Sequence, residues 1–127
     1  HFNDQNNSIK KKFNKINNLI SLHEEEIGNP ILENIFKNKD LKLIGKNKIK
    51  NKNRAPTISF TSKFKTSKEV SDSLISENIA TRNDNFYAWR CLKALGIDTS
   101  DGLIRLSMVH YNNSTDVKKL LKALNKI

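Results

Sequence analysis

The stretch "LIRLSMVHY", residues 103–111, decides the fold, because its apolar positions alternate as they do in a half-buried β-strand. The alternation creates two faces of different character. One face carries Ile104, Leu106, Met108 and His110, and the other carries Leu103, Arg105, Ser107, Val109 and Tyr111. We expect the first face to lie in a core covered by helices, and His110 and Tyr111 to belong to core and sheet. The second face places a guanidinium in mid-strand, so we expect another structural element to pack there.

The segments around this strand predict an α+β fold. Asn112 shapes the turn that follows the strand, and Asn113 can cap a final helix with an apolar face ending at Leu124. Thr66 and Glu69 have the spacing of a capping box and predict a helix that ends near residue 78. The remaining predicted elements are strands at 41–45 and 56–62, an extended piece at 79–82 and a helix at 86–95. We therefore expect a small mixed or antiparallel sheet of about three to four strands, with helices on one face.

A long amphipathic helix is predicted at the N-terminal end, since apolar residues recur from Ile9 to Ile27 at steps of three and four. His23 lies on the same stripe, and we expect its ring to be half-buried rather than to bind a ligand. Gly28, Asn29 and Pro30 predict a break and a second short helix. We expect residues 1–27 to form a linking helix and residues 28–127 to form the small domain proper.

Composition limits the function classes. Residues 1–65 hold 14 Lys or Arg against 6 Asp or Glu, whereas residues 66–127 hold 9 against 7, so the net charge of +10 resides mainly in the first half. The basic loop at residues 45–54 has no interleaved aromatic residue for base stacking, which favours a solvated loop over a nucleic-acid site. A free-standing basic module that binds nucleic acid or another acidic partner remains the alternative function.

Other sequence features argue against several kinds of site. Cys91 is the only cysteine, and the three histidines are far apart, so we expect neither a disulfide nor a metal site. No stretch reaches the roughly 20 apolar residues of a membrane helix, and we expect a cytoplasmic protein. The polar opening without an initiator methionine suggests a fragment.

Three segments together resemble the C-terminal region of class V aminotransferase-like enzymes, especially the cysteine desulfurase-like branch. They are "RAPTISFT" (54–61), "IATRNDNFYAWRCLKALGI" (79–97) and "IRLSMVHYNNSTDVKKLLKAL" (104–124). The resemblance implies the small domain of a fold type I enzyme, whose large domain holds pyridoxal phosphate through a lysine Schiff base. That lysine is absent from this chain, so we expect the fragment alone to be inactive and to bind no cofactor. The resemblance also implies a homodimeric full-length transferase or lyase that acts on an amino acid.

The resemblance assigns roles to four residues. It makes Arg105 the residue that binds the substrate α-carboxylate when the small domain closes over the site, with Arg82 as a weaker second candidate. Tyr87 takes the position of the cysteine desulfurase nucleophile, which is a departure from that branch. Cys91 follows one helical turn later, where we expect a buried small side chain rather than a nucleophile. Desulfuration, lyase, epimerase and transamination chemistry all remain open.

Overall fold

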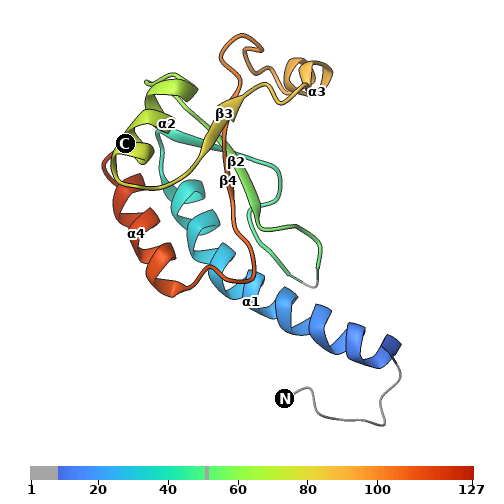
Figure 1. Cartoon of the computed structure of the whole chain (residues 1–127). Coiled ribbons are helices and arrows are strands. Elements are labelled where there is room, and N and C mark those ends of the chain that lie inside the picture. Colours follow the sequence, from blue (N-terminus) through green and yellow to red (C-terminus); the bar gives the residue numbers. More distant parts are fainter. Residues whose placement is uncertain (1–8, 51) are drawn as a thin grey trace.

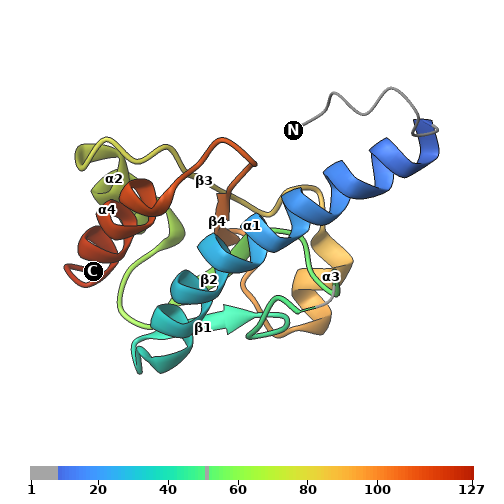
Figure 2. The same cartoon turned by 90° about the horizontal axis from the view of Figure 1, so that it is seen from below.

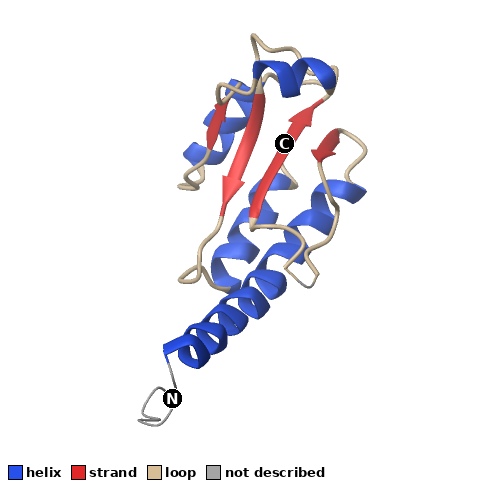
Figure 3. Ribbon diagram, turned by 90° about the vertical axis from the view of Figure 1, so that its right-hand side faces the viewer, coloured by secondary structure: helices blue, strands red, loops and turns tan. Residues whose placement is uncertain are grey.

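A four-stranded antiparallel sheet forms the centre of the computed structural model, which describes residues 9–50 and 52–127. The strands are β1 (Leu41–Ile44), β2 (Thr57–Ser62), β3 (Arg82–Asp84) and β4 (Leu103–Ser107), in the spatial order β1-β2-β4-β3. Figure 3 shows this sheet with helices behind it. The predicted α+β class, with a small sheet covered on one face, is confirmed.

The helices are α1 (Ile9–Lys37), α2 (Ser67–Ser76), α3 (Trp89–Ala94) and α4 (Ser114–Leu124). The C-terminal half of α1 packs against α4 and β1, and α2 contacts β2, β3, β4 and α4, while α3 lies apart at the end of β3 (Figures 1 and 2). Ile58, Phe60, Ile104, Leu106 and Met108 supply the core side of the two central strands, as the alternation predicted. The face that carries Arg105 is therefore the one that α1, α2 and α4 leave uncovered, although Leu103 at its end is buried.

Both predicted helix starts are present as capping boxes. The Thr66 backbone N–H donates to the Glu69 carboxylate at 2.7 Å, and the Thr66 hydroxyl accepts from the Glu69 backbone N–H at 3.2 Å. The Thr66 hydroxyl also donates to the Glu69 carboxylate at 2.8 Å, and this bond together with that from the Thr66 backbone N–H stabilises the ionised form and lowers the pKa of the Glu69 carboxyl. Asn113 and Asp116 form the equivalent box at the start of α4. Each box satisfies backbone donors that the first helical turn leaves unpaired.

The predicted break at Gly28–Pro30 is wrong, because α1 continues through it to Lys37. A proline inside a helix costs about 3 kcal/mol. Burial of Ile27, Ile31, Leu32 and Ile35 on one side of the helix offsets this, since each buried aliphatic side chain contributes about 1.5–3 kcal/mol. The residues that predicted a break make tertiary contacts instead. Asn29 forms two hydrogen bonds with the Ile49 backbone, and Gly28 leaves room for the Ile49 side chain.

The first half of α1 has apolar residues that the described chain leaves uncovered. Ile9, Phe13, Leu19 and Leu22 are all more than half exposed, and the fold covers the helix fully only from Ile27 onward. His23 is half-buried as predicted, with its Nε2 2.7 Å from the Asn112 carbonyl oxygen. The division of the chain at residue 28 stays a prediction, and residues 1–8 of the predicted linking segment lie outside the described residues.

The strand built on residues 103–111 is shorter than predicted. β4 ends at Ser107, and both His110 and Tyr111 are exposed in the turn that follows, so their predicted place in core and sheet is wrong. Asn112 causes the early end, because its side-chain oxygen accepts from the Val109 N–H at 2.9 Å while its own N–H donates to the Val109 carbonyl at 3.0 Å. The predicted role of Asn112 in shaping this turn is confirmed.

Candidate functional site

Two arginines predicted from separate segments lie directly opposite each other in the sheet. Arg105 in the middle of β4 pairs with Arg82 of β3 on one side and with Ser59 of β2 on the other. Residues opposite each other in antiparallel strands project from the same face, with Cβ atoms about 4.5–5.5 Å apart. Two like charges at this spacing repel each other. Within residues 9–50 and 52–127 the ion pairs involve other side chains, so no carboxylate of the described chain neutralises this arginine pair.

Phe86 lies over the Arg105 guanidinium, whose Cζ is 4.3 Å from the ring centroid. Arg105 is half-buried, and a cation above an aromatic face at this distance is a cation–π contact. Among the described residues the hydrogen bonds of Arg105 are made by its backbone, including the Thr81 hydroxyl at 3.4 Å from the Arg105 carbonyl oxygen. The N–H donors along the edge of the guanidinium therefore remain available to a ligand.

A strained turn carries the ring to this position. Phe86 and Tyr87 adopt φ values of 52° and 58°, in the left-handed region that costs a non-glycine residue about 1–2 kcal/mol. Asn85 closes the turn: its carbonyl accepts from the Ala88 N–H at 2.9 Å, and its side-chain oxygen accepts from the Tyr87 N–H at 3.0 Å. The predicted start of a helix at Phe86 is therefore wrong, and α3 begins at Trp89.

The structure separates the two predicted positions linked to sulfur chemistry. Tyr87 is 96% exposed in the turn before α3, and Cys91 is exposed on α3, so the predicted burial of Cys91 is wrong. Because Tyr87 lies outside the helix, the two residues also do not share one helix face. The reason for the error is that α3 has only six residues and buries only Leu92, so its other side chains face solvent.

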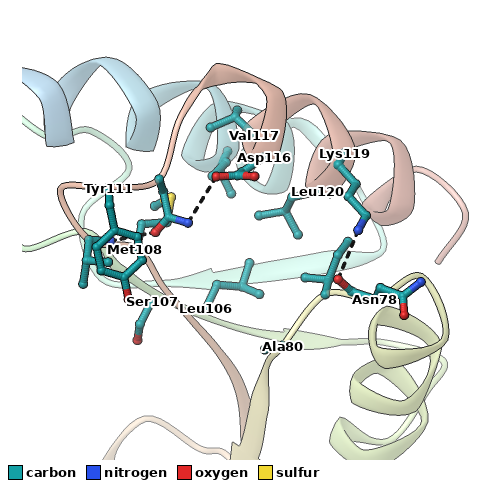
Figure 4. Close-up of a pocket in the computed structure, with 14 residues that line it drawn as sticks. Asn78, Ala80, Leu106, Ser107, Met108, Tyr111, Asp116, Val117, Lys119 and Leu120 are labelled. Carbon is teal, nitrogen blue, oxygen red and sulfur yellow. Dashed lines mark hydrogen bonds between the residues drawn. The ribbon is translucent and has the colours of Figure 1, made fainter.

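A cavity of about 340 Å³ lies on the helix side of the sheet, where the chain leading into β3 parts from the end of β4. Figure 4 shows Leu106, Met108, Val117 and Leu120, which are among the apolar residues that line it. Lys119 closes one end by donating to the Asn78 carbonyl at 3.2 Å. Sequence reasoning did not find this cavity, because residues from three separate segments line it. None of the four predicted site residues contributes to its lining.

The basic loop is anchored at Ile49 and Arg54, while Lys46, Lys48, Lys50 and Lys52 are exposed. Ile49 is buried, and the Arg54 guanidinium folds back onto the carbonyls of Lys46 and Thr57. Partial burial of its guanidinium lowers the Arg54 pKa. Elsewhere in the described part of the chain, no three His, Cys, Asp or Glu side chains gather as a metal site would require. None of the described helices is long and apolar enough to cross a membrane.

The sequence model of the Aminotransferase class-V family matches residues 12–120. This match covers most of the sequence, and the chain belongs to that family. It is 26% identical over 109 residues to the aminotransferase-like protein FGM3 of Gibberella zeae, a match that covers 85% of this chain and 27% of that protein.

Solved structures show the same fold in larger proteins. The cysteine desulfurase of Thermococcus onnurineus superposes with a TM-score of 0.73 at 22% identity, covering 84% of this chain and 25% of that one. The cysteine desulfurase CsdA of Escherichia coli gives a TM-score of 0.69 at 18% identity, covering 84% and 24%. This chain thus spans about a quarter of the length of these relatives. At such identities the likeness concerns the fold alone.

Proposed function

We propose that this chain is the small C-terminal domain of a pyridoxal-phosphate-dependent class V enzyme, and that it closes over an amino-acid substrate and binds the α-carboxylate through Arg105. The observation that carries the proposal is the Arg105–Arg82 pair, which faces away from the core without an acidic partner in the described chain. A guanidinium presents two parallel N–H donors that match a carboxylate, and such a pair fixes the orientation of the bound group. Arg82 supports the same anion from the neighbouring strand.

We also propose that none of the described lysines holds the cofactor. A Schiff-base lysine lies in an enclosed pocket, whereas the described lysines are exposed apart from the half-buried Lys65. In this family pyridoxal phosphate acts as an electron sink for chemistry at the α-carbon of an amino acid. We propose that a separate domain, on the same or another chain, binds pyridoxal phosphate and provides the Schiff-base lysine. We call the combination of both domains the assembled enzyme and expect it to be a cytoplasmic homodimer.

A carboxylate titration of this chain tests the proposed site. With ¹⁵N-labelled protein, we expect L-alanine to shift the Arg105 Nε–Hε signal and the amides of Arg82 and Ser59, because these residues line one strip of the uncovered face. Affinity in the millimolar range is enough for this measurement, since a lone surface carboxylate site corresponds to about 4 kcal/mol or less. Ethylammonium chloride, which lacks the carboxylate, is the matched control.

The same titration distinguishes the alternative function. Uniform shifts at Lys46, Lys48, Lys50 and Lys52 without a change at Arg105 would contradict the proposal and favour a basic module that attracts anions in general. The salt dependence of nucleic-acid affinity then separates the carboxylate site from the basic module further, because a loop that neutralises several phosphates loses affinity steeply as the salt concentration rises.

Cys91 is expected to be dispensable for turnover. By the family resemblance Tyr87 takes the position of the desulfurase nucleophile, and Cys91 is exposed on α3 rather than held in that turn. We therefore expect Cys91→Ala to change kcat of the assembled enzyme by less than about threefold, whereas loss of a catalytic nucleophile removes orders of magnitude. A drop of about a thousandfold, with persulfide detected on Cys91, would assign the enzyme to desulfuration.

A further inference from the structure

Arg105 has an aromatic partner that no part of the proposed function explains. The Phe86 ring stands 4.3 Å from the guanidinium carbon, and the neighbours across the sheet are Ser59 and the like-charged Arg82. Of these three neighbours, the ring is the one that attracts the guanidinium. An unrestrained arginine samples many rotamers, and each rotamer that points away from a ligand weakens binding.

The stack and a carboxylate use different parts of the guanidinium. An aromatic ring covers one flat face, while the N–H donors lie in the plane and point outward from its edge. A bidentate carboxylate thus approaches along the edge without displacing the ring. A ring above the guanidinium carbon therefore restrains the group while its edge donors can still bind a carboxylate.

The ring itself sits on a well-anchored turn. Besides the two hydrogen bonds to Ala88 and Tyr87, the Asn85 side-chain amide donates to the Thr99 carbonyl at 3.5 Å. Phe86 also occupies a left-handed position where glycine or asparagine is the favoured residue. Residues kept in such conformations gather at functional sites, where the surrounding structure compensates for the strain. Here the Asn85 hydrogen bonds hold the turn, and the contact with Arg105 holds the Phe86 ring.

We propose that Phe86 is a positioning residue that orients the Arg105 guanidinium for the substrate α-carboxylate. This inference rests on the proposed function, because Phe86 does not contact the substrate and acts only through Arg105. It predicts an effect on substrate binding rather than on the chemical step, because the carboxylate is bound alike in the ground state and the transition state.

Steady-state kinetics of the assembled enzyme test the inference. Phe86→Leu and Phe86→Met, which keep bulk but lose the aromatic face, are expected to raise KM for the amino acid about 3- to 10-fold, equivalent to about 0.6–1.4 kcal/mol. We expect kcat to stay within about twofold, and Phe86→Tyr to restore KM because tyrosine retains the π face. Trp89→Leu is the matched control, since this exposed aromatic residue lies just beyond the same turn without stacking on Arg105.

A second measurement on the 127-residue chain is independent of catalysis. The side-chain proton signals of Arg105 are expected to lie upfield in the wild type and in Phe86→Tyr, and to return to ordinary values in Phe86→Leu. In an Arg105→Gln background, Phe86→Leu should raise KM no further, because both changes remove one interaction.

The outcomes separate this inference from the proposed function. If Arg105 variants lose binding while Phe86→Leu and Phe86→Met keep the wild-type KM, the positioning role is wrong and the carboxylate site stands. If Phe86→Leu lowers kcat and KM is unchanged, the ring acts in another step and the inference is also wrong. If Arg105 variants leave KM and kcat unchanged, the proposed function fails and the inference with it.

Discussion

Replacing Arg105 by lysine in the assembled enzyme is expected to lower kcat/KM about 30- to 1000-fold, or about 2–4 kcal/mol of transition-state binding. Lysine keeps the positive charge but presents a point charge in place of a planar fork, so the bidentate geometry is lost. The stack with Phe86 weakens as well, because an ammonium has no flat face to lay against the ring.

Melting temperature measured on the same Arg105→Lys protein distinguishes a binding role from a structural one. Arg105 makes no ion pair within the described residues and loses only part of a cation–π contact worth about 0.5–1 kcal/mol, so we expect the melting temperature to fall by no more than about 4 °C. A lower melting temperature together with an unchanged kcat/KM would identify Arg105 as a structural residue and remove its role in the reaction.

Gly102→Ala is expected to destabilise the domain by about 3 kcal/mol or more, which corresponds to a melting temperature about 10 °C lower. Gly102 has a φ of 78°, and an added Cβ would meet the Asp84 carbonyl group and, at 2.7 Å, the Asn85 nitrogen. These are backbone atoms at the end of β3, where Asp84 pairs with Leu103, so they cannot rotate away as a side chain would. The change would also disturb the turn that carries Phe86.

Gly96→Ala is the matched control for this prediction. Gly96 has a similar φ of 68°, but nothing lies within 4 Å of the position its Cβ would take. It should therefore lose only the conformational term of about 1 kcal/mol. Equal losses at both glycines would show that the close approach of Gly102 to Asp84 is absent in solution.

The local sequence pattern was enough to predict much of this fold. Alternation located β2 and β4 and the core face of each, and cap spacing located the starts of α2 and α4. These features depend on neighbours within a few residues, and tertiary packing did not override them. At Gly28–Pro30 the local signal for a break was strong, yet four buried aliphatic residues on one side keep α1 continuous.

The spatial arrangement of the site could not be predicted from the sequence. Arg105 and Arg82 were each proposed from resemblance, but their direct opposition depends on the register of β3 against β4. The stack of Phe86 on Arg105 was not predicted, because two consecutive aromatic residues give no sign of a left-handed turn. Only the preceding Asn85, a residue common in turns, indicated that a turn lies here. Cys91 is exposed because α3 is short. The sequence pattern over residues 86–95 predicted a longer helix than the structure has.

The central claim is that Arg105 binds the α-carboxylate, and the most direct measurement compares affinities of the assembled enzyme for L-alanine and for ethylamine, which is alanine without its carboxylate. We predict that the wild type prefers alanine by at least about 30-fold, and that Arg105→Lys reduces this preference at least about tenfold while leaving ethylamine binding unchanged. Equal preference for alanine in the wild type and in Arg105→Lys would contradict the claim.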